Sequence, residues 1–118
     1  YNANPASVEL AIKRINNIDI KGKKILVLGD MLELGNLSLK AHKELSKMIN
    51  SSTIDIIITY GKHTKKTSMN IVESKYSKHY TNKNKLKIEL NSLICKNDLI
   101  YLKGSRSMEL EKLYINNK

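Results

Sequence analysis

The stretch ILVLGD, at residues 25–30, decides the fold of this 118-residue chain. Its first four residues form an uninterrupted apolar run, which stops at a glycine and an aspartate. A strand that is apolar at every position is buried on both faces, as is typical of a strand inside a parallel sheet. The run therefore predicts a parallel β-strand over residues 25–28, with helices on both sides of its sheet.

Two further apolar runs share this pattern. The run IDIIIT at residues 54–59 is β-branched almost throughout and is followed by Gly61, and LIYL at residues 99–102 is followed by Lys103-Gly104. A weaker strand is expected around residues 79–81. Three strands thus end at glycine-bearing turns, at Gly29-Asp30, Gly61-Lys62 and Gly104-Ser105. The carboxyl ends of parallel strands meet at one edge, where ligands of open α/β sheets bind.

Between these runs, apolar residues recur at the spacing of one helical face. This spacing predicts helices over residues 5–15, 38–49, 64–73, 83–94 and 107–114. Strands and helices alternate, so the expected fold class is α/β. We expect one Rossmann-like, three-layer domain over residues 1–118, with a mostly parallel sheet flanked by helices.

The chain is strongly basic, with 21 Lys and Arg against 11 Asp and Glu and a formal net charge of +10. Three explanations stay open: compositional drift toward lysine on solvent faces, an anionic small ligand such as ATP or a UDP-sugar, and nucleic acid. Only two arginines are present, and Trp and Phe are absent. The chain therefore lacks the usual side chains for base stacking.

Cysteine content and hydropathy exclude other classes. Cys95 is the single cysteine, so no internal disulfide can form, and its apolar neighbours predict that it packs in the interior. No stretch of about 18 uncharged apolar residues occurs, so no membrane-spanning helix is expected.

The turn Lys103-Gly104-Ser105-Arg106 carries the sharpest chemical signal. It places two cations and a hydroxyl at the start of the helix expected over residues 107–114, where free backbone N–H groups favour an anion. Arg106 can bind a carboxylate or phosphate through two parallel hydrogen bonds. Ser105 can equally cap the helix, and capping and ligand binding are compatible.

Other candidate sites carry weaker signals. Asp30 and Glu33 follow the first strand, and they either hold Mg²⁺, orient an ammonium group or form a solvated turn. The GxxxxGK[ST] phosphate loop is absent, so this domain has no ATP phosphate cradle of its own. A GxGxxG motif is also absent after the first strand, which argues against a dinucleotide enzyme. The residues alone predict a ligand-binding α/β domain with no catalytic residue and no metal site of its own.

Three motifs, in this order and at these separations, resemble the C-terminal domain of the Mur ligase family. They are YNANPxS at residues 1–7, LGDMLELG at 28–35 and LKGSRSMELEK at 102–112. The resemblance is to the branch that adds D-alanyl-D-alanine to UDP-N-acetylmuramoyl-tripeptide in peptidoglycan precursor synthesis. It implies that the chain is a fragment of a larger cytoplasmic, ATP-dependent ligase and is inactive alone. The alternative is a basic α/β module that binds nucleic acid.

The resemblance also implies ligands and site residues. A central domain missing from this chain would hold ATP and Mg²⁺, and the C-terminal domain would close over the active site. Contacts to the nucleotide would come from Tyr1, Asn2 and Asn4. Contacts to D-alanyl-D-alanine would come from Asp30, Lys103, Gly104, Ser105 and Arg106. No site is assigned to residues 62–96, which carry little family signal.

Overall fold

The computed structural model of the chain describes residues 4–31 and 38–104. The elements in chain order are α1 (Pro5–Asn16), β1 (Lys24–Gly29), α2 (Ser38–Asn50), β2 (Ile56–Tyr60), α3 (Lys65–Met69), β3 (Tyr76–Tyr80), α4 (Lys83–Leu93) and β4 (Leu99–Lys103). The helix predicted over residues 107–114 lies outside the described residues.

The four strands form one sheet in the order β3-β2-β1-β4, and every neighbouring pair is parallel. β1 lies inside the sheet, where Ile25 is opposite both Ile56 of β2 and Ile100 of β4. All six residues of β1 are buried. The predicted α/β class with a parallel sheet is therefore confirmed.

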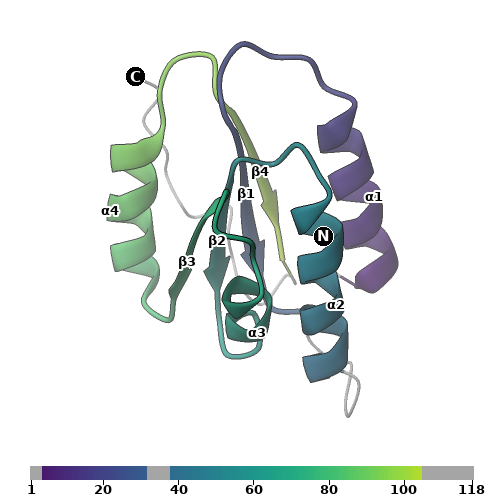
Figure 1. Cartoon of the computed structure of the whole chain (residues 1–118). Coiled ribbons are helices and arrows are strands. Elements are labelled where there is room, and N and C mark those ends of the chain that lie inside the picture. Colours follow the sequence, from purple (N-terminus) through teal and green to yellow (C-terminus); the bar gives the residue numbers. More distant parts are fainter. Residues whose placement is uncertain (1–3, 32–37, 105–118) are drawn as a thin grey trace.

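Helices cover both faces of the sheet (Figure 1), with α1, α2 and α3 on one face and α4 on the other. Side chains alternate along a strand, so Leu26 and Leu28 pack toward α1 and α2 while Ile25 and Val27 pack toward α4. α1 buries the helical face predicted from the sequence, which consists of Val8, Ala11, Ile12 and Ile15. In the part of the chain that the structure describes, no helix combines the length and the apolar content needed to cross a membrane.

α3 is shorter than predicted: it covers Lys65–Met69 instead of residues 64–73. The side chain of Asn50 explains where it ends. Its Nδ2 donates to the Asn70 carbonyl at 2.9 Å, and its Oδ1 accepts the Val72 N–H at 2.9 Å. These bonds hold residues 70–72 in a turn against the end of α2, so the prediction that the helix continues to residue 73 is wrong.

β3 begins three residues earlier than predicted, at Tyr76 instead of residue 79. It is an edge strand whose residues are exposed or half-buried, so it lacks the continuous apolar run that marked β1 and β2. Its position is set by pairing with β2, where Tyr76 lies opposite Ile56 and Tyr80 lies opposite Tyr60.

The amino ends of β1 and β4 are joined by Asp98. Its carboxylate accepts the backbone N–H groups of Lys23 at 2.7 Å and Cys95 at 2.9 Å, and Lys23 Nζ lies 3.2 Å from Oδ2. Burial acts to raise the pKa of Asp98, but these bonds outweigh it and hold the pKa below its usual value. Cys95 itself is exposed in this turn, so the prediction that it packs in the interior is wrong.

Candidate functional site

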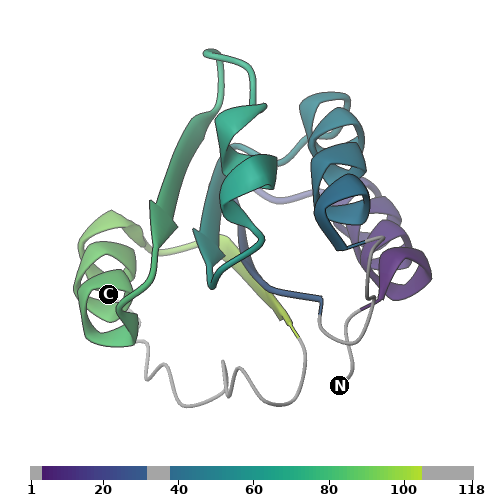
Figure 2. The same ribbon diagram turned by 90° about the horizontal axis from the view of Figure 1, so that it is seen from below.

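The carboxyl edge of the sheet collects most of the candidate residues that the structure describes. Because the strands are parallel, their carboxyl ends share one edge, and each helix that runs back along the sheet begins at that edge. Figure 2 looks onto this edge. This edge of the sheet carries Asn4 before α1, Asp30 after β1, residues 61–64 after β2, and Lys103-Gly104 at the end of β4.

Asn4 is the N-cap of α1. Its Oδ1 accepts the Ser7 N–H at 2.9 Å, and Ser7 Oγ accepts the Asn4 N–H at 3.0 Å. Such reciprocal capping satisfies two backbone donors at the helix start. The residue is exposed, and its Nδ2 makes no hydrogen bond to any described residue. The cap thus uses the amide oxygen and leaves the amide NH₂ available to a ligand.

Asp30 is 1% exposed, and its carboxylate binds the backbone of the turn that follows β2. Oδ2 accepts the Lys62 N–H at 2.7 Å, Oδ1 accepts the Thr64 N–H at 2.9 Å, and the His63 N–H lies 3.0 and 3.1 Å from the two oxygens. A buried carboxylate needs such donors, because an unpaired charge away from water is costly. Asp30 thereby fastens residues 61–64, named here the 61–64 turn, to the end of β1.

Gly61 opens this turn with a backbone φ of +126°. A Cβ at this position would lie 2.5 Å from both Cγ and Oδ1 of Asp30. Glycine is required for two independent reasons, namely the left-handed conformation and the close approach of the carboxylate.

A buried histidine supports the same corner of the fold. His42 of α2 is fully buried, and its Nε2 accepts the Met31 N–H at 2.8 Å. Its backbone carbonyl accepts the hydroxyl of Thr67 in α3, and its ring lies 5.8 Å from that of His63 between centroids. β1, α2 and α3 are therefore joined directly behind the 61–64 turn.

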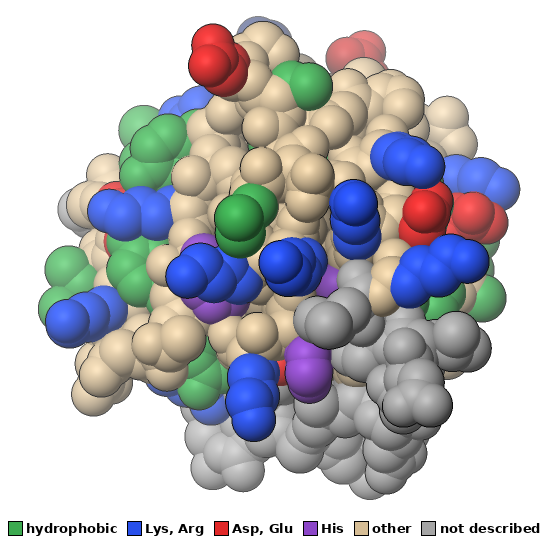
Figure 3. All heavy atoms as spheres, turned by 60° about the horizontal axis from the view of Figure 1, so that its bottom comes forward, with side chains coloured by type: hydrophobic (Ala, Val, Ile, Leu, Met, Phe, Trp, Pro, Cys, Tyr) green, Lys and Arg blue, Asp and Glu red, His purple; other side chains and the backbone are tan. Residues whose placement is uncertain are grey.

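Among the described residues, the surface at this edge is cationic. Figure 3, which turns the bottom of the molecule forward, shows lysine and histidine side chains on the part of this surface that the structure describes. Lys62 is exposed, and no ion pair joins it to an acid among residues 4–31 and 38–104. Among the described residues of this edge, Asp30 follows β1, and both of its oxygens are bonded to backbone N–H groups. An anionic ligand would therefore meet positive potential here.

The described residues provide no metal site. No group of three or more His, Cys, Asp or Glu in the described ranges is arranged to hold a metal ion. Of the two acids proposed for Mg²⁺, Asp30 has its oxygens occupied by N–H groups, and Glu33 lies outside the described residues.

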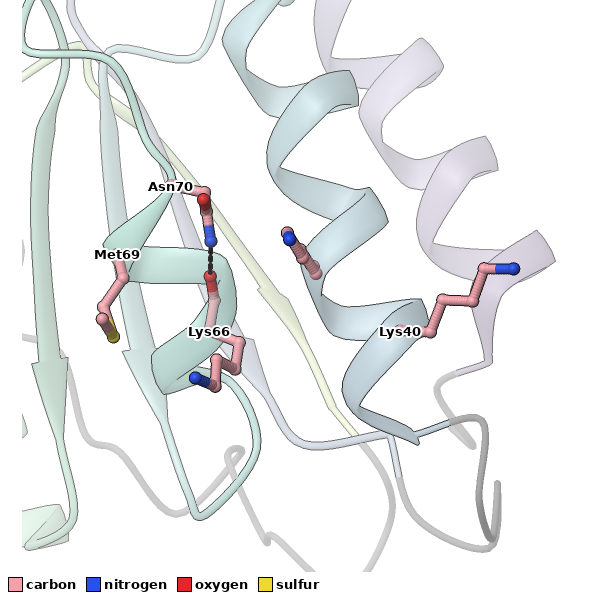
Figure 4. Close-up of a pocket in the computed structure, with 5 residues that line it drawn as sticks. Lys40, Lys66, Met69 and Asn70 are labelled. Atoms are coloured by element: carbon pink, nitrogen blue, oxygen red, sulfur yellow. Dashed lines mark hydrogen bonds between the residues drawn. The ribbon is translucent and has the colours of Figure 1, made fainter.

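A groove of about 470 Å³ between α2 and α3 is a less suitable site. It is lined by Lys40, Lys43, Lys66, Met69 and Asn70. Figure 4 shows that Lys40 points away from α3, and that the Asn70 amide is bonded to the Lys66 carbonyl, at 2.6 Å. Its polar groups do not converge on one point, so a small anion finds no set of donors there.

A second polar cluster fastens β3 to α4. Glu89 Oε2 accepts the hydroxyls of Tyr80 at 2.8 Å and Tyr76 at 3.1 Å, and Lys78 Nζ lies at 3.2 Å. The Tyr80 hydrogen bond, aided by those from Lys78 and Tyr76, lowers the pKa of Glu89 despite partial burial. Three groups from β3 converge on this one oxygen, which indicates a structural role for the cluster.

The structure brings together part of the site predicted from the sequence. Asn4, Asp30, Lys103 and Gly104 lie on one edge, whereas Tyr1, Asn2, Ser105 and Arg106 fall outside the described residues. The structure adds the bonds between Asp30 and the 61–64 turn, in a region to which the sequence assigned no site. The one available signal was Gly61-Lys62, which the sequence marked as one of three glycine-bearing turns at the ligand-binding edge.

Comparisons with known proteins point to one family. A family model described as the glutamate ligase domain of Mur ligases matches residues 1–106. A UDP-N-acetylmuramoyl-tripeptide–D-alanyl-D-alanine ligase of Bacillus subtilis is 40% identical over 116 residues, which are 96% of this chain and 25% of the relative. The enzyme of the same name from Escherichia coli is 31% identical, over 96% of this chain and 24% of the relative.

Solved structures that resemble this chain point to the same family. MurF from Acinetobacter baumannii superposes with a TM-score of 0.83 at 27% identity, covering 96% of this chain and 25% of that one. The MurF ligase of Thermotoga maritima in complex with ADP gives 0.77 at 25% identity, with the same coverage. The chain therefore spans about a quarter of the length of these relatives.

Proposed function

Because the chain belongs to the Mur ligase family, in which it matches the glutamate ligase domain, we propose that it is the C-terminal domain of a D-alanyl-D-alanine-adding ligase. The full-length enzyme would use ATP to join D-alanyl-D-alanine to UDP-N-acetylmuramoyl-tripeptide, in peptidoglycan precursor synthesis. The observation that carries this proposal is the 40% identity to the B. subtilis ligase over 96% of the chain. The reaction consumes ATP and a nucleotide-linked precursor, so the proposal includes a cytoplasmic location.

In this reaction the tripeptide carboxylate would accept the terminal phosphoryl group of ATP. The amine of the dipeptide would then attack the acyl phosphate and release inorganic phosphate as the amide forms. The ADP bound to the T. maritima relative supports nucleotide use. Since the described residues supply neither a phosphate loop nor a metal site, Mg²⁺ and the ATP phosphates would be held by the rest of the enzyme.

The carboxyl edge of the sheet would close over the bound substrates. Tyr1, Asn2 and Asn4 would contact the nucleotide at one side of this edge. The dipeptide would lie against the end of β4, with its carboxylate bound by Lys103, Gly104, Ser105 and Arg106. We propose a different role for Asp30 from the direct contact implied by the resemblance: its oxygens bind the 61–64 turn, so it would act on ligands through that turn.

The isolated 118-residue domain should release no phosphate from ATP and form no amide. Assays would contain UDP-N-acetylmuramoyl-tripeptide, D-alanyl-D-alanine, ATP and Mg²⁺, with phosphate and amide product measured in parallel. The full-length enzyme is the positive control and should form both products in equal amounts. ATP-dependent turnover by the domain alone would contradict the division of labour proposed here, and a full-length enzyme without amide product would contradict the function itself.

In the full-length enzyme, Asn4→Ala should raise the KM for ATP, because it removes an amide that can donate to the nucleotide. It also removes the helix cap, which costs about 1 kcal/mol of stability. Asn4→Ser separates the two effects, since serine caps a helix as well as asparagine but has no NH₂ group. We expect Asn4→Ser to restore the melting temperature and to keep the raised KM for ATP. Recovery of both by serine would show that Asn4 only caps α1.

A further inference from the structure

The 61–64 turn is held by more hydrogen bonds than are needed simply to connect β2 to α3. Three consecutive N–H groups, of Lys62, His63 and Thr64, donate to one buried carboxylate at 2.7 to 3.1 Å. Gly61 adopts a conformation that other residues rarely take, and its own N–H donates to the Tyr80 carbonyl at 3.1 Å. The backbone of Lys62 is therefore fixed on both sides, while its side chain is exposed at the carboxyl edge.

We infer that Lys62 binds an anionic oxygen group of a substrate, and that Asp30 positions Lys62 for this contact through the 61–64 turn. The inference rests on the proposed function, because the ligands are those of the ligase reaction. A rigid backbone suits this role, since less conformational entropy is lost when the side chain orders on a ligand.

Two observations support Lys62 as the anion contact. Its ammonium group forms no ion pair with an acid among the described residues, a feature that it shares with several other described lysines. The acid that binds the backbone N–H of Lys62 is Asp30. Asp30 is buried, and its oxygens accept backbone N–H groups. A ligand anion would therefore not have to displace a carboxylate of any described residue.

The position of Lys62 along the edge fits a ligand that also reaches β4. β2 lies beside β1, and β1 lies beside β4, so the turns after β2 and β4 are two strand spacings apart. Two spacings amount to about 10 Å. Lys62 and Lys103 would then contribute cations on either side of the end of β1, where Asp30 is buried.

Of the substrates, this domain is proposed to contact ATP and D-alanyl-D-alanine, which carry such an anion as a phosphate and a carboxylate respectively. The test uses the full-length enzyme with one substrate varied at a time. We expect Lys62→Ala to raise the KM for one of these substrates by about tenfold, as for the loss of a charge-assisted hydrogen bond. The melting temperature should not change, and Lys62→Arg should restore part of the affinity. The substrate whose KM rises identifies the source of the anion.

Lys66→Ala is the matched control, because Lys66 is an exposed lysine of neighbouring α3 that lies outside the turn. It should leave both constants unchanged. If Lys62→Ala changes neither KM by more than twofold while the wild type is active, Lys62 binds neither of these two anions and the inference is wrong. A wild-type enzyme that forms no amide would instead overturn the proposed function, and this inference with it.

Asp30→Asn tests the positioning role. The amide keeps the shape of the side chain but replaces one acceptor oxygen by a donor group, which opposes the N–H groups of the turn. We expect a lower melting temperature together with a higher KM for the same substrate that Lys62→Ala affects. A lower melting temperature with both constants intact would restrict Asp30 to a structural role.

Discussion

Gly61→Ala should destabilise this domain by about 2–4 kcal/mol, more than any surface substitution in it. Alanine at a backbone φ of +126° is strained, and its Cβ would meet Asp30 Cγ and Oδ1 at 2.5 Å. Relief requires the carboxylate to move, and that movement breaks its bonds to the 61–64 turn. For a chain of this length, the melting temperature should fall by about 8–16 °C.

A double-mutant cycle separates the two causes of this loss. In an Asp30→Ala background the carboxylate is gone, so Gly61→Ala should cost only the backbone strain, about 1–3 kcal/mol. The coupling energy between the two substitutions then measures the contact between Cβ and the carboxylate. Thermal unfolding of the four variants supplies the data. A Gly61→Ala protein that melts within about 2 °C of wild type would refute the role assigned to Gly61.

Arg106→Ala in the full-length enzyme should weaken use of D-alanyl-D-alanine by about 2–4 kcal/mol, a factor of about 30 to 900 in kcat/KM. The amine of the dipeptide must be neutral to attack, so its carboxylate is the group that needs a cation. The KM values for ATP and UDP-N-acetylmuramoyl-tripeptide should change much less. Arg106→Lys should rescue only part of the loss, because lysine cannot form two parallel bonds to a carboxylate.

The competing role for Arg106 is structural. Glu109 and Glu111 follow it in the sequence, and a pairing with either would brace the helix expected there. That role predicts a lower melting temperature with normal dipeptide kinetics. Steady-state rates at varied dipeptide concentration, beside a melting curve of the same variant, distinguish the two roles. An unchanged KM for the dipeptide in a destabilised variant would show that Arg106 has the structural role.

The buried strands could be predicted from the sequence because their burial leaves a continuous apolar run. β1 and β2 were placed within two residues of their observed bounds for this reason. β3 was misplaced because an edge strand alternates exposed and half-buried residues, so only its pairing with β2 defines it. The end of α3 depends on the side chain of Asn50, some twenty residues away in the sequence.

Only part of the candidate site could likewise be predicted from the sequence. The motifs that carry the family resemblance predicted Asn4, Asp30 and the turn after β4 as site residues without any coordinates. The bonds of Asp30 could not be predicted, because its partners are backbone N–H groups 32 to 34 residues later, which leave no trace in side-chain chemistry. Lys62 resembles any other lysine of a lysine-rich chain until the geometry of its turn is known.

The strand order also determines when the carboxyl edge becomes complete during folding. β1 pairs with β2, which follows it in the chain after a single crossover connection. The pairing of β1 with β4 instead joins distant parts of the chain, since the Leu99 N–H donates to the Lys23 carbonyl. Contacts of high sequence separation form late, because the intervening chain must be ordered before they contribute. We therefore expect amides of β4 to gain protection from hydrogen exchange after those of β1 and β2. An incompletely folded domain would then contain the 61–64 turn but lack the turn after β4, so the cationic edge would exist in full only in the native state.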